Sequence, residues 1–216
     1  MTDRSQPEGQ PALSSPPSNL RSFPSARLDE GRQVARSHKT TNDPWWFSSI
    51  PAFGGGRFDL PAPRGTCYVA DSITTAVLER LRETLVRSGV VTTRMADSFI
   101  VSLFAIPGTY RCAHIGVAKA AHFGVTRELA TLAPRYYPLS QEWADSFDRN
   151  GYEGIRYGTR FAPGPANAWA IFGMSGADMR PHLVVNEKVS GREACRRSGI
   201  RVQPIPRLSA LTVIDP

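Results

Sequence analysis

Apolar and polar positions divide the chain into a polar first part and a longer part with regular periodicity. Residues 1–43 are rich in Pro, Ser, Gly, Gln and Arg and show almost no apolar repeat. Such a segment buries too little apolar surface to offset the entropy lost on ordering. We therefore predict a disordered or loosely attached arm over 1–43 and a single domain over 44–216. Trp45, Trp46 and Phe47 stand at this boundary, either as a first core contact or as a lid over a site.

In the second part, short alternating runs predict strands, and apolar residues spaced by three and four predict helices. The clearest helix follows Asp71 or Ser72 as its N-cap and ends at Gly89. The predicted strands span 66–70, 98–106, 110–115, 154–157, 168–172 and 183–189. Residues 200–205 are predicted to form either a last strand or an extended tail. The predicted helical segments span 73–87, 119–123, 126–133, 140–150 and 191–198.

The order of these elements favours one fold class. The strands are short and are interrupted by helices of unequal length, so the regular alternation of a doubly wound sheet is missing. Strand 110–115 is the expected hairpin partner of strand 98–106. Ser140 is the expected cap of helix 140–150. We therefore predict an α+β domain.

Composition narrows the class of protein without changing this fold. The 216 residues are 41% hydrophobic and 21% charged, which is typical of one globular domain. No run reaches the roughly 18–20 apolar residues of a membrane span, and the first residues lack the apolar core of a signal peptide. We expect a cytoplasmic protein with no membrane partner. Cys67, Cys112 and Cys195 are widely spaced and are interpreted as buried apolar residues, with a reactive thiol as the alternative.

The net charge of +7 indicates either a solvated basic face or attraction to an acidic protein or a nucleotide. A modest cluster is formed by Arg192, Arg196, Arg197 and Arg201. No nucleic-acid-binding motif accompanies these arginines, so direct binding to nucleic acid is not expected.

The most informative stretch is GGGRFDLPAPRGTCYVADSITTAVLER, which begins at Gly54. Its glycines permit positive φ and close approach of a ligand, and the Arg57 fork suits a diphosphate or ribose hydroxyls. Glu79 lies on the following helix and would stabilise a ribosyl cation, with Glu83 as a competitor on the same face. The alternatives are a surface arginine and a solvated glutamate. Tyr68 is either a ring that stacks on a ligand or a core tyrosine.

A third element, GYEGIRYGTR, spans residues 151–160. It places a hydroxyl and an arginine, Thr159 and Arg160, at the end of a predicted strand. A loop and a second apolar strand follow. This arrangement is typical of the edge of a ligand site, although the motif by itself is weak.

Together these three elements resemble the RES domain family, which is named for an arginine, a glutamate and a serine. The resemblance runs from about residue 53 to 173 through GGRF, GTCYVA, AVLE and GYEGIRYGTR. Carried over by position, the arginine is Arg57, the glutamate is Glu79 and the serine position is Thr159. Threonine keeps the hydroxyl but adds a methyl group and stiffens χ1.

The resemblance implies a fold similar to ADP-ribosyltransferases, with a split, curved β-core, flanking helices and an NAD cleft. It further implies the toxin of a toxin–antitoxin pair that cleaves the nicotinamide–ribose bond of NAD by hydrolysis or phosphorolysis. An antitoxin with a DNA-binding domain is the implied partner. NAD is then a substrate, inorganic phosphate is a possible co-substrate, and no metal is implied.

The resemblance also assigns roles. Glu79 would stabilise the ribosyl cation, Arg57 would hold the diphosphate or the nicotinamide ribose, and Tyr68 would pack on the nicotinamide side. Thr159 would hydrogen-bond to the ribose or the nicotinamide amide. Candidates of second rank are Phe58 for stacking, Arg160 for an anion, and Arg64 and Arg156 for an acceptor phosphate.

Two other functions stay open at this point. One is an ADP-ribosyltransferase that modifies a macromolecule, against which Val77 counts, because a second carboxylate or glutamine two residues before Glu79 would favour arginine modification. The other is a domain that binds a nucleotide or a partner without turnover. Loss of NAD distinguishes the binding domain from both enzymes, and label on protein distinguishes the two enzymes.

Overall fold

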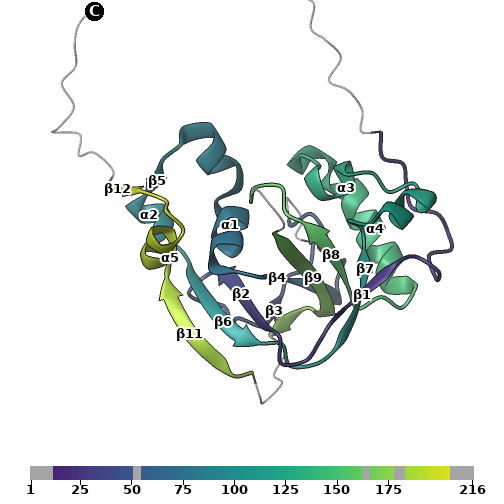
Figure 1. The fold of residues 1–216 in the computed structure, drawn as a ribbon, viewed down its shortest axis with the longest axis horizontal. Helices are drawn as coiled ribbons and strands as arrows, with labels where there is room; N and C mark the ends of the chain where they lie inside the picture. Colours follow the sequence, from purple (N-terminus) through teal and green to yellow (C-terminus); the bar gives the residue numbers. More distant parts are fainter. Residues whose placement is uncertain (1–11, 51–54, 163–165, 178–182, 205–216) are drawn as a thin grey trace, which may run out of the picture.

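A computed structural model describes residues 12–50, 55–162, 166–177 and 183–204. The chain folds into a mixed sheet with helices gathered at its two sides (Figure 1). The strands are β1 Ser25–Leu28, β2 Gln33–His38, β3 Trp46–Phe47, β4 Arg64–Ala70, β5 Val91–Thr92, β6 Ile100–Ala105, β7 Tyr110–His114, β8 Gly154–Gly158, β9 Asn167–Met174, β10 Gly176–Ala177, β11 Val185–Ser190 and β12 Val202–Gln203. The helices are α1 Ile73–Ser88, α2 Thr93–Ala96, α3 Glu128–Thr131, α4 Tyr137–Arg149 and α5 Gly191–Arg197, with short 3₁₀ helices η1 Ala118–Phe123 and η2 Pro134–Tyr136.

The main sheet has eight strands in the order β1-β7-β8-β9-β4-β2-β6-β11. Its two halves meet between β2 and β4, where Ala35 and Ala70 form the single registered pair. By contrast, β4 and β9 pair along seven residues, from Arg64 opposite Met174 to Ala70 opposite Ala168. The sheet is therefore split at the β2–β4 boundary, and the predicted α+β class with a split core is confirmed.

The helices pack on the two halves of this sheet separately. Helices α1, α2 and α5 lie beside the β2-β6-β11 half, whereas α3 and α4 lie beside β8 and β7 (Figure 1). A core cluster that includes Val77, Leu81 and Val101 joins α1 to the first half. Another, which includes Trp143 and Phe147, joins α4 to the second half.

The β4–α1 unit follows the sequence signals closely. Ser72 is extended (φ −152°) and its hydroxyl accepts a hydrogen bond from the backbone N–H of Thr75, which makes it the N-cap. Gly89 ends α1 in the left-handed conformation (φ 62°), and its N–H donates to the carbonyl of Leu85. The predicted cap and stop of this helix are both confirmed.

The prediction of a loose arm over 1–43 is wrong for its described part, residues 12–43; residues 1–11 lie outside the described residues. β1 pairs with β7 and β2 pairs with β6, so both strands belong to the main sheet. Leu13, Leu20 and Phe23 are buried in the core beside α4. The hydroxyl of Tyr152 donates to the carbonyls of Leu20 and Phe23 at 3.0 and 2.6 Å. A few apolar anchors and distant hydrogen bonds thus order a segment that has almost no local periodicity.

Two other predictions differ from the structure. β7 pairs antiparallel with β1 and parallel with β8, so it is not the hairpin partner of β6. Helix α4 begins at Tyr137, and Ser140 is a buried residue of its first turn whose hydroxyl donates to the Tyr137 carbonyl. The remaining predicted elements are present with shifted ends, and Ile205 lies outside the described residues.

Candidate functional site

A pocket of about 930 Å³ opens where the sheet is split. Its walls come from β2, β3, β4, the start of α1 and the turn around Gly55–Asp59. β2 and β4 share a single registered pair, and residues of both strands line the pocket. This volume lies near the upper end of the roughly 300–1,000 Å³ that is usual for small-molecule sites.

The pocket is lined by more positive than negative side chains. Among the described lining residues, Arg36, Lys39, Arg57 and Arg80 carry positive charge, whereas Asp59 and Glu79 carry carboxylates. A concave site with this balance attracts anions, phosphate groups in particular.

Arg57 is held inside the wall of the pocket. Its side chain is only 5% exposed, and among the described residues its Nε has no hydrogen-bond partner. The guanidinium carbon lies 6.0 Å from the ring centroid of Phe58 and 5.5 Å from that of Tyr137. A buried guanidinium N–H without a partner is costly unless a ligand accepts from it, so Arg57 is suited to bind an anion or another polar ligand.

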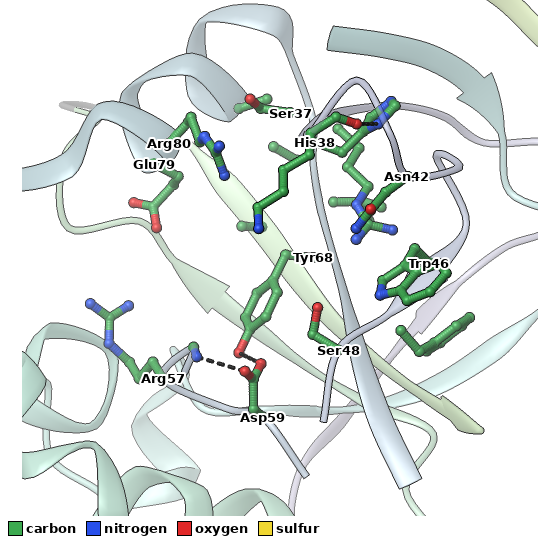
Figure 2. A pocket seen from close by; sticks show the side chains of 18 of the residues that line it. Ser37, His38, Asn42, Trp46, Ser48, Arg57, Asp59, Tyr68, Glu79 and Arg80 are labelled. Atoms are coloured by element: carbon green, nitrogen blue, oxygen red, sulfur yellow. Dashed lines mark hydrogen bonds between the residues drawn. The ribbon is translucent and has the colours of Figure 1, made fainter. Parts of the chain in front are cut away.

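The turn that carries Arg57 is fixed by Asp59 and Tyr68. The Asp59 carboxylate accepts the Gly56 N–H at 2.6 Å and the Tyr68 hydroxyl at 2.8 Å (Figure 2). The Tyr68 hydroxyl in turn accepts the Phe58 N–H at 2.8 Å. Removal from solvent, together with the Asp59 carboxylate, raises the pKa of Tyr68 well above its ordinary value, so the hydroxyl stays a donor.

Gly56 is required by this close approach. A Cβ at this position would lie 2.5 Å from the Tyr68 hydroxyl and 2.6 Å from a carboxylate oxygen of Asp59. On its other side, the Gln141 side-chain amide of α4 donates to the Gly56 carbonyl at 3.0 Å. The glycine-rich turn therefore serves to bring the backbone against Tyr68, as well as to present Arg57. Gly54, the first of its three glycines, lies outside the described residues.

Glu79 reaches the pocket from α1. It is half-buried, and its carboxylate points toward the side of the pocket on which Arg57 lies (Figure 2). Three of the residues predicted from the sequence, Arg57, Tyr68 and Glu79, are thus brought together although 22 positions separate the first from the last. The side chain of the competitor Glu83 lies outside the described residues.

The other predicted site residues lie elsewhere in the part of the chain described. The ring of Phe58 is fully buried and packs edge-on against Tyr157, with centroids 5.2 Å apart. Thr159 donates from its hydroxyl to the Ala162 carbonyl at 3.4 Å, and the exposed Arg160 covers Phe161. These three residues are absent from the described lining of the pocket. Phe58 is therefore a core residue that contributes its backbone N–H, and not a ring for stacking.

The two arginines expected to hold an acceptor phosphate are also engaged outside the pocket. Arg64 forms a two-point ion pair with Asp148 at 3.0 and 2.8 Å. Arg156 donates to the side-chain oxygen of Asn167 at 3.3 Å. The cations that line the pocket with Arg57 come from β2, the turn after it and α1 instead.

Comparison with known proteins agrees with this architecture. The model of the RES domain matches residues 31–190, well over half of the chain. The chain belongs to the RES domain family. No curated protein matches it.

Among solved structures, this RES domain is similar to a chain of "Crystal structure of the M.tuberculosis MbcT-MbcA toxin-antitoxin complex". The TM-score is 0.57 at 10% sequence identity, and the match covers 80% of this chain and 92% of that chain. At this identity, the likeness shows that the two chains share a fold.

Arg36 and Lys39 line the pocket of the RES domain although the sequence did not predict them there, and Trp46, expected either in the core or over a site, lines it too. Arg36 is 7% exposed. Its Nη1 donates to the Pro44 carbonyl and to the Cys67 sulfur, each at 2.8 Å. The available signal was the short run QVARSH at residues 33–38. It could have indicated β2 and Arg36 if residues 1–43 had not been predicted to be disordered.

His38 follows Arg36 on the pocket side of β2. Its Nδ1 lies 2.9 Å from the Lys39 carbonyl, and its Nε2 lies 2.9 Å from the Ser102 hydroxyl. Since the carbonyl only accepts, Nδ1 carries the proton and Nε2 accepts from Ser102. Burial, with a further contribution from the charge of Arg36, lowers the pKa of His38, so the ring is neutral and both nitrogens are occupied.

The three cysteines are buried and free, as predicted. Burial raises the pKa of Cys67 to about 11 and that of Cys112 to about 12, and it raises the pKa of Cys195. Thiols in this state are poor nucleophiles, so the reactive-thiol alternative has no support.

Within the described ranges there is no cluster of three His, Cys, Asp or Glu residues suited to a metal. Nor does any helix there have the length and apolar character to cross a bilayer.

The basic cluster near α5 is largely neutralised by ion pairs. Arg192 pairs with Asp97, Arg196 with Glu193, and Arg197 with Glu187 and Glu193. The positions of these carboxylates favour the solvated-face interpretation of the cluster. The cations that line the pocket are a separate set, Arg36, Lys39, Arg57 and Arg80.

Proposed function

We propose that this protein cleaves the nicotinamide–ribose bond of NAD, by hydrolysis or by phosphorolysis, as the toxin of a toxin–antitoxin pair. One observation carries the proposal. Arg57 is more than nine-tenths buried, its Nε has no hydrogen-bond partner among the described residues, and it lies in the same pocket as the carboxylate of Glu79. A cation and a carboxylate in one pocket match the two needs of this reaction, which are to hold phosphate or ribose and to stabilise a ribosyl cation.

The chemistry assigns a role to each group. The bond between C1′ of the ribose and N1 of nicotinamide breaks, and its electron pair leaves with nicotinamide, which becomes neutral. Positive charge develops on the ribose, and the Glu79 carboxylate stabilises it. An oxygen of water or phosphate then bonds to C1′, and for water the released proton passes to solvent. Because the leaving group starts as a cation, no strong general acid is required.

The Asp59–Tyr68 pair takes a positioning role in this proposal. It holds the turn from Gly56 to Asp59, and through that turn it holds Arg57 against the pocket. Tyr68 therefore acts mainly through its hydroxyl, while its ring lines the pocket between Arg57 and Trp46 (Figure 2).

Membership of the RES family and the similarity to a chain of a solved toxin–antitoxin complex support the toxin role. We further propose an antitoxin partner that carries a DNA-binding domain, and action in the cytoplasm, where NAD is available. The open, positively lined pocket is the part of this surface that such a partner would need to cover.

The test is NAD consumption by the purified full chain, with and without inorganic phosphate, followed by phosphorus NMR and mass spectrometry. We expect loss of NAD with free nicotinamide. ADP-ribose identifies hydrolysis, and a phosphorylated ADP-ribose that appears only with phosphate identifies phosphorolysis. Label from adenine-labelled NAD that stays on protein would identify a transferase instead.

The variant that tests the site is Glu79→Gln, which keeps the size of the side chain and removes its charge. We expect NAD cleavage to fall at least about 100-fold while the unfolding midpoint changes little. Full activity in folded Glu79→Gln protein would overturn the site. Absence of turnover by the wild-type protein, with NAD bound, would leave a binding domain.

A further inference from the structure

Trp46 is a large aromatic side chain that the fold turns away from the core. Its neighbours Trp45 and Phe47 are each 2% exposed and pack edge-on with ring centroids 5.4 Å apart. Since successive side chains in a strand point to opposite faces, these two fix Trp46 on the other face. There its indole is half-buried and lines the pocket.

Trp46 lies at the opposite end of the pocket from the proposed reaction centre. Figure 2 shows it on the right with Asn42, whereas Arg57 and Glu79 lie on the left and Tyr68 lies between. Arg36 also lines the pocket, and its Nη1 donates to the Pro44 carbonyl and the Cys67 sulfur. A dinucleotide has two bases joined through a diphosphate. With one base at Glu79, the second base is directed toward Trp46.

We propose that Trp46 is the platform on which the adenine base of the substrate stacks, so that the pocket selects the dinucleotide over nicotinamide mononucleotide. The inference rests on the proposed function for the direction in which NAD lies. Aromatic rings bind bases through their faces, and an indole offers the largest face among side chains. Its half-exposed position in a polar pocket leaves that face available, and the core packing of its two neighbours holds it in place.

The first test compares kcat/KM for NAD and for nicotinamide mononucleotide in Trp46→Leu and Trp46→Phe. Leucine keeps apolar bulk without an aromatic face, whereas phenylalanine keeps a smaller face. We expect Trp46→Leu to lower kcat/KM for NAD by about 5- to 150-fold, mainly through KM, with Trp46→Phe between it and wild type. The mononucleotide, which lacks adenosine, should be cleaved at an unchanged rate. An equal loss for both substrates would show that Trp46 has only a structural role and would overturn the inference.

A second test measures binding without turnover. Calorimetry with AMP should show weaker binding to Trp46→Leu by a similar factor and unchanged binding to Tyr136→Leu. The latter is a matched control, because Tyr136 is also half-buried but is absent from the described lining of the pocket. Equal AMP affinity in Trp46→Leu and wild type would overturn the inference.

A third measurement does not require the leucine variant to fold. In protein labelled with fluorotryptophan, the resonance of Trp46, assigned with Trp46→Phe, should shift on addition of AMP and not on addition of the mononucleotide. A resonance that AMP does not shift overturns the inference. The two failures are distinguishable. AMP binding at Trp46 without NAD turnover would reject the proposed function alone, and turnover that does not depend on Trp46 would reject this inference alone.

Discussion

Two turns of this RES domain each carry an arginine from the predicted site. The first carries Arg57, the second carries Arg160 beside Thr159, and different hydrogen bonds hold them. The turn at Gly55–Asp59 is held by Asp59, Tyr68 and Gln141, with hydrogen bonds between 2.6 and 3.0 Å. In the described part of the segment after β8, Thr159 makes two contacts of 3.4 Å, from its hydroxyl to the Ala162 carbonyl and from its N–H to the Ala166 carbonyl. The first buries its arginine in the pocket, and the second leaves its arginine exposed. Convergent bonds from separate elements therefore distinguish a preorganised site from a surface loop that has a similar local sequence.

The largest expected difference is between the two arginines. Arg57→Ala should lower kcat/KM for NAD at least about 100-fold, because it removes a buried donor set from the pocket. Arg160→Ala should change it less than about threefold, because Arg160 is exposed and covers Phe161. Steady-state kinetics and thermal unfolding of both variants check this. Similar losses for the two would mean that the third element, too, reaches the substrate.

The second largest difference is expected between Gly56 and Gly158, in the free energy of unfolding of their alanine variants. Gly56→Ala would place a Cβ 2.5 Å from the Tyr68 hydroxyl, so we expect a loss of about 1–3 kcal/mol in the free energy of unfolding, together with lower activity. Gly158→Ala meets nothing within 4 Å and should stay within about 0.5 kcal/mol of wild type. Urea unfolding measures both. A neutral Gly56→Ala would show that the turn is not held against Tyr68.

Tyr68→Phe separates the two roles considered for this residue. It keeps the ring and removes the hydroxyl, which leaves Asp59 and the Phe58 N–H without that bond. We expect stability to fall by about 1–3 kcal/mol and kcat to fall with it. A cycle with Asp59→Ala should be non-additive, since both substitutions break one network. Unchanged kcat in Tyr68→Phe would support ring packing as the main role.

The smallest effects are expected at Thr159. Its hydroxyl contacts the Ala162 carbonyl at 3.4 Å, so Thr159→Ala should alter stability by no more than about 0.5 kcal/mol and leave NAD cleavage within about twofold. Thr159→Ser should be tolerated. The kinetics of both variants provide the check. A folded but inactive Thr159→Ala would place this hydroxyl on the substrate and remove the contrast between the two turns.

Local signals were sufficient for a large part of the fold. The N-cap Ser72, the stop at Gly89 and the alternation in β4 act within one or two turns of chain, so the sequence by itself determined the β4–α1 unit. The same unit carries Tyr68 and Glu79 and follows the Arg57 turn. Three members of the candidate site were therefore predictable from the sequence.

Only the tertiary structure decided which residues meet at the pocket and where the ordered chain begins. The Tyr152 hydroxyl bonds to Leu20 across 132 positions of sequence, and no local pattern reports such a contact. The same holds for Arg36 and Trp46, which reach the pocket because β2 and β3 join strands far along the chain. Thr159 has a suitable side chain in a suitable motif, yet its hydroxyl donates to the Ala162 carbonyl and it is absent from the described lining of the pocket. Side-chain chemistry and short-range conformation are written in neighbouring residues, whereas proximity depends on packing between distant segments.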